Sequence, residues 1–296
     1  MGVPMCEHLL RAGYSLTINS RTKVKAEGLL QQGAQWVETA AEIVADTDVV
    51  LTMLGFPKDV RDIYLSREGL LAKARPGQVF VDLTTSEPAL AREIVERARE
   101  QDVLVLDAPV SGGDAGAKQG TLSIMVGGDP SAFEAVKPVL GVFGKLLVHH
   151  GAAGCGQHAK LCNQITIAGT MVGVCEALLY AHQAGLDGEK LLESIRQGAA
   201  GCWALDHLAP KILQRDFAPG FFVEHFIKDM GIALVEANRM GLLLPGLAVV
   251  HKLYQAVQTY GHGRSGTHAL FLALEHMSPT HLVPANGSLP SSPVVR

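Results

Sequence analysis

The strongest constraint on the fold is a change of pattern near the middle of the chain. Between residues 15 and 150, short apolar runs rich in Val, Leu and Ile alternate with amphipathic segments, which predicts strands and helices in turn. After Gly154 only helical periodicity recurs. A repeated strand, helix, strand order is typical of a parallel, doubly wound sheet. We therefore predict an α/β domain with such a sheet, followed by an all-α domain.

The element boundaries follow from the same patterns. Apolar runs predict six strands, at residues 15–19, 48–54, 78–83, 103–108, 122–126 and 146–150. Helical periodicity predicts helices at residues 22–32, 156–184, 188–197, 206–214, 223–240, 246–260 and 267–277. The two domains then cover residues 1–152 and 153–277. Four prolines within residues 278–296 predict a disordered tail.

Composition excludes several classes of function. The 296 residues contain 25 Lys and Arg against 29 Asp and Glu, and this net charge of −4 leaves no basic surplus for nucleic acid. No uninterrupted apolar run approaches the roughly 20 residues of a membrane span, and the amino terminus lacks a signal-peptide pattern. The five scattered cysteines form no C-x-x-C pair, and the 12 histidines show no metal-binding spacing. We expect a soluble cytoplasmic protein with no metal, membrane or nucleic-acid partner.

Polar and glycine-rich segments follow three of the predicted strands. They are residues 19–23, 82–88 and 107–113, with the sequences NSRTK, DLTTSEP and DAPVSGG. Open α/β sheets bind their ligands at the carboxyl ends of their strands, so these segments are the candidate binding loops. A further polar segment, KLCNQ at residues 160–164, lies in the first turns of the long predicted helix.

Together, the Ser-Gly-Gly and Lys-x-x-Asn segments identify a resemblance. From Met1 to about Glu275 the sequence resembles the β-hydroxyacid dehydrogenases, a family that includes 3-hydroxyisobutyrate dehydrogenase and tartronate semialdehyde reductase. The resemblance implies a Rossmann-like dinucleotide-binding domain over residues 1–152 and a substrate and dimerisation domain over residues 153–277. It also implies hydride transfer between NADP(H) or NAD(H) and a small 3-hydroxy acid or semialdehyde. The homo-oligomer it implies, a dimer or a tetramer, agrees with the long apolar helix.

The resemblance assigns a catalytic lysine and a substrate loop. Lys160 matches the family's catalytic lysine, because a hydride leaving an alcohol requires a base and the reverse reaction requires an acid. Ser111, Gly112 and Gly113 match the loop that binds the substrate carboxylate, where glycines let N–H groups approach an anion. The substrate-binding residues Asn163 and Gln164 follow on the helix. As isolated features, the lysine would be a solvated side chain and the tripeptide an ordinary turn.

The remaining matches concern the cofactor, at Gly2, Met53, Leu54, Thr85 and Lys228. Met53 is nearly as well explained as a core residue, and Lys228 beside Asp229 as a helix-surface ion pair. The choice of cofactor depends on the end of the first strand, where NAD-preferring folds place an acid. This sequence has no acid there, and its cofactor-binding candidates are Ser20, Arg21 and Thr22, followed by Lys23. These donors suit a 2′-phosphate, so we expect NADP to be preferred, with NAD possible.

The amino terminus departs from the family pattern. In the family a strand and a G-x-G-x-x-G turn precede the segment that begins here at Met1, and Gly2 would be the third glycine. We expect a truncated sequence. The alternative is a cofactor-impaired protein that serves as a nucleotide-binding module or scaffold.

Several related functions stay open at this point. A tartronate semialdehyde or glyoxylate-type reductase fits as well as a 3-hydroxyisobutyrate dehydrogenase, because Gln164 replaces a more usual Asn and leaves the pocket size undefined. Decarboxylating 6-phosphogluconate enzymes carry a His where Asn163 stands, and imine reductases usually replace the lysine at position 160. Both of these classes fit the sequence less well.

Overall fold

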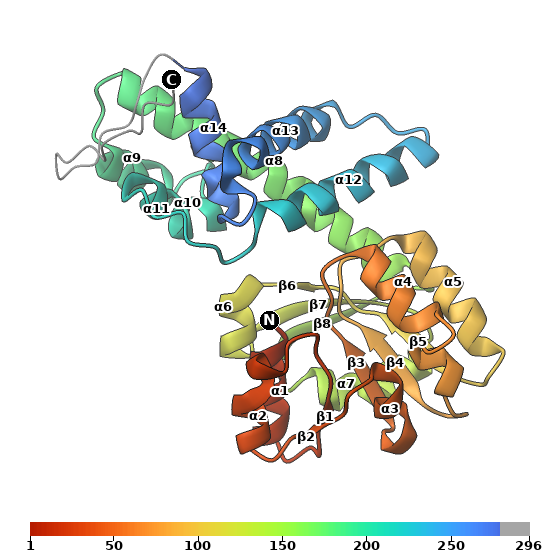
Figure 1. The fold of residues 1–296 in the computed structure, drawn as a ribbon. Helices are drawn as coiled ribbons and strands as arrows, with labels where there is room; N and C mark the ends of the chain where they lie inside the picture. Colours follow the sequence, from red (N-terminus) through yellow and green to blue (C-terminus); the bar gives the residue numbers. More distant parts are fainter. Residues whose placement is uncertain (279–296) are drawn as a thin grey trace, which may run out of the picture. The chain divides into compact units, whose positions relative to one another are not determined.

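The computed structural model describes residues 1–278, so the predicted tail lies outside the described residues apart from Ser278. The chain divides into two compact units, residues 1–163 and residues 164 onward (Figure 1). The first contains all the strands, and the second is helical. The predicted fold class, a Rossmann-like α/β domain followed by an all-α domain, is confirmed.

A six-stranded sheet forms the centre of the first unit. Its order is β3-β4-β5-β7-β6, and β8 pairs with the other edge of β7. The pairs β3/β4, β4/β5 and β7/β8 are parallel, whereas β7 is antiparallel to both β5 and β6, so the sheet is mixed where we predicted a parallel one. The strands are β3 (Val49–Thr52), β4 (Val79–Asp82), β5 (Leu104–Asp107), β6 (Val110–Ser111), β7 (Leu122–Gly127) and β8 (Gly144–Gly151).

A second, two-stranded parallel sheet lies in the same unit. It pairs β1 (Thr17–Ile18) with β2 (Gln35–Trp36). Both β2 and β6 are absent from our predicted strands. The predicted helix at residues 22–32 is a 3-10 turn (Lys23–Ala26) followed by α2 (Glu27–Gln31), and it ends before Gly33, whose φ is +99°. The other helices of this unit are α1 (Gly2–Arg11), α3 (Ala40–Ile43), α4 (Pro57–Leu65), α5 (Pro88–Arg99), α6 (Gly113–Gln119) and α7 (Pro130–Leu140), with 3-10 turns at Val44–Asp46 and Leu70–Lys73.

Alternation along the central strands builds a separate core on each face of the sheet. On β4, Val79 and Val81 pack in one apolar cluster and Phe80 in the other, because successive side chains of a strand point to opposite faces. The first cluster takes side chains from α1, α6 and α7, and the second from α4 and α5. Helices thus cover both faces, which leaves the strand ends available for ligands.

The second unit consists of helices in the part that the structure describes. Helix α8 (Cys155–Gln183) begins in the first unit and continues into the second. The predicted helix at residues 206–214 is divided in two, α10 and α11, and Pro210 lies in the first turn of α11. The elements are α9 (Gly188–Ile195), α10 (Trp203–His207), α11 (Ala209–Leu213), α12 (Val223–Arg239), α13 (Pro245–Val257), a π-helical turn (Gln258–His262), a 3-10 turn (Thr267–Ala269) and α14 (Leu270–Met277).

Helix α8 is long and apolar enough to cross a membrane by length and composition alone. In the most apolar 18-residue stretch of this helix, 39% of the stretch is buried inside the protein. The sequence analysis found no such span because polar and charged residues, among them Lys160, Asn163 and Glu176, interrupt the apolar residues of this helix. A core helix of a soluble protein passes the same test, so one such helix is weak support for a membrane protein.

Candidate active site

The candidate site starts from a row of polar side chains at the ends of three parallel strands. Thr52, Asp82 and Asp107 are register partners across β3, β4 and β5, each at the carboxyl end of its strand. All three side chains are buried. Because buried polar groups must find partners, this row determines how the loops that follow the strands are held.

Thr52 and Asp82 link the loops after β3 and β4. The Thr52 hydroxyl donates to Asp82 Oδ1 at 2.9 Å, and the backbone N–H of Thr84 donates to the same oxygen at 3.1 Å. The backbone N–H of Leu54 then donates to Thr84 Oγ1 at 2.9 Å. Leu54 and the neighbouring Met53 therefore lie beside the loop that carries Thr85.

Asp107 caps the amino terminus of α8. Its Oδ1 accepts the N–H of Gly154 at 2.7 Å, and its Oδ2 accepts the N–H of Gln157 at 2.8 Å. Burial raises the pKa of this carboxyl to about 6, although both of these hydrogen bonds lower it. The helix approaches the strands closely at Gly156, where a Cβ would collide with the carbonyl oxygens of Met125 and Asp107.

Gln157 connects the same helix terminus to the loop after β4. Its Nε2 donates to the Thr84 carbonyl at 2.8 Å, and its Oε1 accepts the Ser86 N–H at 2.8 Å. The side chain is fully buried. The peptide units on both sides of Thr85, itself half-buried, are therefore tied to α8.

Lys160 and Asn163 follow on the next turn of α8. Lys160 is buried and Asn163 is half-buried. The Ser111 hydroxyl, at the end of β6, donates to Asn163 Oδ1 at 3.2 Å. Gly112 and Gly113 then lead into α6 with φ of +126° and +60°, a region that side chains with a Cβ rarely adopt. The predicted substrate loop and the turn of α8 that carries Lys160 and Asn163 thus meet in the first unit.

The predicted residues of the second unit form their own network. Gln164 is buried and donates from Nε2 to Asp229 Oδ2 at 2.6 Å, on α12. Lys228 forms an ion pair with Asp229 Oδ1 at 2.9 Å, and both side chains are largely buried. The Lys228–Asp229 pair is therefore better shielded from water than a pair on a helix surface would be.

Of the remaining cofactor candidates, Ser20, Arg21 and Thr22 are exposed and Gly2 is half-buried. Arg21 follows β1 with its side chain 82% exposed, and its guanidinium lies 3.7 Å from Asp59. Ser20 Oγ accepts the Thr22 N–H at 3.4 Å in the same loop. Gly2 occupies the first turn of α1, and a Cβ there would meet nothing within 4 Å.

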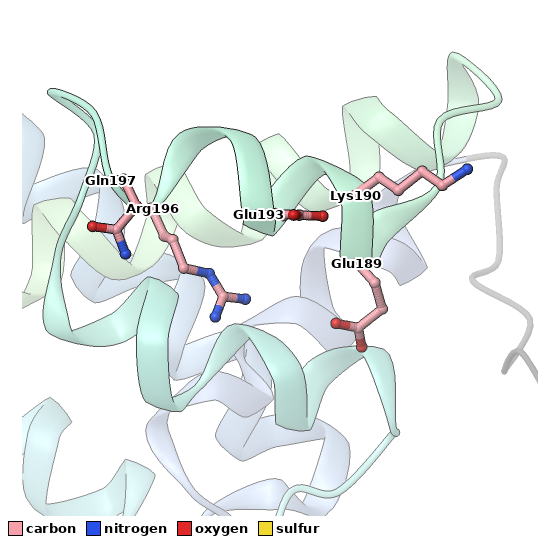
Figure 2. A pocket seen from close by; sticks show the side chains of 5 residues that line it. All are labelled: Glu189, Lys190, Glu193, Arg196 and Gln197. Carbon is pink, nitrogen blue, oxygen red and sulfur yellow. The ribbon is translucent and has the colours of Figure 1, made fainter.

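Two other features lie apart from these residues. A shallow hollow on α9 is lined by Glu189, Lys190, Glu193, Arg196 and Gln197, as Figure 2 shows, and none of the predicted site residues lines it. Among residues 1–278, no group of three or more His, Cys, Asp or Glu side chains could hold a metal ion.

The sequence analysis gave no role to Thr84, Asp107 or Gln157. Thr84 and Asp107 do lie in the polar segments that follow the strands, so their positions were a usable signal. Gln157 precedes Lys160 by three residues and therefore shares its helix face. That spacing was its only signal in the sequence.

Comparisons with known proteins agree with the geometry. The family model described as the NAD binding domain of 6-phosphogluconate dehydrogenase matches residues 1–173. The model described as NAD-binding of NADP-dependent 3-hydroxyisobutyrate dehydrogenase matches residues 154–274. The chain belongs to the β-hydroxyacid dehydrogenase family. The predicted resemblance is thereby confirmed.

Individual relatives cover nearly the whole chain. A probable 3-hydroxyisobutyrate dehydrogenase-like protein of Arabidopsis thaliana is 49% identical over 94% of this chain and 83% of its own length. The 2-hydroxy-3-oxopropionate reductase of Escherichia coli is 35% identical over 94% of this chain and 95% of its own. The structure of Mycobacterium tuberculosis 3-hydroxyisobutyrate dehydrogenase with L-serine is 34% identical, with a TM-score of 0.84 over 93% of this chain and 95% of that one.

These findings establish the class of reaction. The protein is an oxidoreductase of the hydroxy-acid dehydrogenase type that uses a nicotinamide dinucleotide. The predicted enzyme class is confirmed.

Proposed function

We propose that this dehydrogenase interconverts a small 3-hydroxy acid and its semialdehyde, with Lys160 as the acid and base. The observation that carries the proposal is the contact between Ser111 and Asn163 one turn beyond the buried Lys160. If the Ser111 hydroxyl and the N–H groups of Gly112 and Gly113 donate to the substrate carboxylate, the 3-hydroxyl group of the same substrate can lie near the face of α8 that carries Lys160.

The chain's residues fit a nicotinamide cofactor at the strand ends. Met53, Leu54 and Thr85 lie on two loops joined by the hydrogen bond from Leu54 to Thr84, where open α/β sheets bind dinucleotides. Gly2 lies in the first turn of α1, and helix N-termini favour the binding of phosphate groups. When bound, the cofactor supplies or accepts the hydride. Lys160 takes the substrate hydroxyl proton in oxidation and returns it to the carbonyl oxygen in reduction.

The preferred cofactor in this proposal is NADP. Arg21 follows β1 and its guanidinium is exposed, and Ser20 and Thr22 flank it in the sequence. A guanidinium matches a 2′-phosphate with two parallel hydrogen bonds. In the proposal, Lys228 contacts the cofactor and Gln164 binds the substrate, and Asp229 orients both side chains through its ion pair with Lys228 and its hydrogen bond from Gln164.

The second candidate substrate is tartronate semialdehyde, supported by the name of the Escherichia coli relative. The test measures oxidation of 3-hydroxyisobutyrate, glycerate and L-serine and reduction of tartronate and succinic semialdehydes, each with NADP and NAD. The substrate with the highest kcat/KM identifies the reaction. Higher kcat/KM with NADH than with NADPH would contradict the cofactor preference.

The role of Lys160 is tested by Lys160→Ala in the same assays. We expect kcat to fall by about 10²- to 10⁴-fold, the usual contribution of a general acid or base. Lys190→Ala, on exposed α9, is the control and keeps full activity (Figure 2). Full activity of Lys160→Ala would overturn the assignment, and no turnover by the unmodified protein of any 3-hydroxy acid tested would support the non-catalytic alternative.

We also propose a homo-oligomer that acts in the cytoplasm. Large apolar side chains of the second unit are exposed, among them Leu243 at 88% and Met240 at 62%. Exposed apolar patches of this kind are typical of surfaces that bind another chain. All five cysteines are free thiols, which suits a reducing compartment.

A further inference from the structure

Gln157 forms three hydrogen bonds within the first unit, through its main-chain N–H and both ends of its side-chain amide. Its main-chain N–H donates to Asp107, its Nε2 donates to Thr84 and its Oε1 accepts from Ser86, all at 2.8 Å. These partners lie 50 to 73 residues away in the sequence. The fully buried side-chain amide makes two of these three bonds and has one favourable orientation, because exchanging its oxygen and nitrogen would leave the Thr84 carbonyl and the Ser86 N–H without partners.

The two hydrogen bonds of the Gln157 side chain hold the backbone on both sides of Thr85. The Thr84 carbonyl and the Ser86 N–H belong to the peptide units immediately before and after Thr85. Fixing both peptide planes fixes the backbone of Thr85 and the direction of its side chain.

We propose that Gln157 is a positioning residue. It holds the loop after β4, which carries Thr85, at a fixed position relative to the amine of Lys160. Gln157 and Lys160 are three residues apart on α8, so they share a helix face and move as one rigid body. The inference rests on the proposed roles of Thr85 and Lys160. Hydride transfer requires the reacting atoms to be about 3 to 3.5 Å apart, so a loose loop slows the chemical step more than it weakens substrate binding.

The chain contains a matched control for a purely structural glutamine. Gln78 is also buried, accepts the Arg75 N–H at 2.7 Å and donates to the carbonyls of Val44 and Thr47 at 2.8 and 2.6 Å. It precedes β4, at the end opposite the candidate site. Replacing Gln78 with Met therefore removes buried hydrogen bonds of the same kind as replacing Gln157 does, but none of them holds the backbone around Thr85.

The test compares Gln157→Met, Gln157→Glu and Gln78→Met with the unmodified enzyme. We expect both Gln157 variants to lose about ten- to a hundredfold in kcat, with the substrate KM changed less than about threefold. The deuterium isotope effect on kcat, with the cofactor labelled at the transferred position, should rise. Gln78→Met should lower the melting temperature but keep kcat and the isotope effect.

A second measurement needs neither cofactor nor turnover. Amide hydrogen exchange at Ser86 should speed up in Gln157→Met and stay slow in Gln78→Met, because the side-chain oxygen of Gln157 accepts that N–H and Met has no such acceptor. Unchanged exchange, or unchanged kcat together with a low isotope effect, would overturn the inference. If Lys160→Ala keeps full activity, the proposed function fails, whereas an inactive Lys160→Ala beside fully active Gln157 variants contradicts only the role of Gln157.

Discussion

At the scale of single residues, Asp107 shows two opposing effects on one carboxylate. Its oxygens accept two N–H groups at the positive end of a helix, which favours the charged form. Burial disfavours that form and outweighs the hydrogen bonds, so the pKa rises to about 6. A raised pKa means that the folded state binds a proton more tightly than the unfolded state does.

Asp107 should therefore make unfolding depend on pH. Its stabilising contribution is complete below about pH 4 and is lost as the pH rises through about 6. A shift of about two pKa units corresponds to roughly 3 kcal/mol. We expect the difference in unfolding free energy between the protein and Asp107→Asn to shrink by up to that amount between pH 4 and 7. Denaturant titrations at each pH measure it, and a constant difference would contradict the prediction.

The proposed preference for NADP can be tested by replacing Arg21. Arg21→Ala removes a charge-assisted contact worth about 1.5 to 3 kcal/mol, so kcat/KM for NADPH should fall by roughly ten- to a hundredfold. The value for NADH should stay within about twofold, because that cofactor has no 2′-phosphate. Arg11→Ala removes the same charge from the end of α1 and serves as the control. Equal losses with both cofactors would show that Arg21 does not read the 2′-phosphate.

At the scale of elements, the start of α8 approaches the ends of the strands closely. Gly156 lies against main-chain atoms of Met125, Asp107 and Gly127, which cannot rotate away as a side chain would. Asp107 caps the same turn, and Gln157 extends from it. Because Gly156 has no Cβ, the start of α8 can lie against these main-chain atoms.

Gly156→Ala should destabilise the protein for this reason. We expect a loss of about 2 to 4 kcal/mol in unfolding free energy, since the new methyl group can be accommodated only by moving backbone. Gly28→Ala in α2, where a Cβ meets nothing within 4 Å, should instead be neutral or stabilise by up to about 1 kcal/mol. Chemical denaturation measures both. Equal effects of the two substitutions would contradict the close approach.

Periodic elements could be predicted from the sequence, and short or long-range features could not. Helices α12 and α8 lie within one residue of their predicted ends, because many residues repeat one pattern. Strands β2 and β6 have two residues each, too few for a period. The antiparallel pairing of β7 depends on partners distant in the chain, which local patterns do not encode.

The same distinction applies to the candidate site. Lys160 and Ser111 stand in short motifs that a sequence displays directly. Gln157 acts through main-chain atoms of residues more than 70 positions away, and those partners can be any residue type. Only the folded structure shows that they meet. A resemblance to a family therefore finds the residues that perform chemistry more readily than those that hold them in place.

At the scale of the whole molecule, α8 belongs to both compact units because it begins in the first and continues into the second. The second unit exposes apolar side chains along α12, α13 and their connection: Val235, Met240, Leu242, Leu243 and Val249. A monomer rarely leaves such side chains grouped in water. This surface is the one we expect to be buried between copies of the chain.

Leu243→Lys should weaken that association. Leu243 is 88% exposed in the single chain, so the substitution costs little folding stability, whereas a lysine buried in an apolar interface loses its hydration. We expect the oligomer dissociation constant to rise at least about tenfold, measured by sedimentation velocity over a range of concentrations. Glu193→Lys on α9 makes a comparable surface change and should leave the association intact. An unchanged dissociation constant for Leu243→Lys would place the interface elsewhere, and a monomer at every concentration would contradict the oligomer itself.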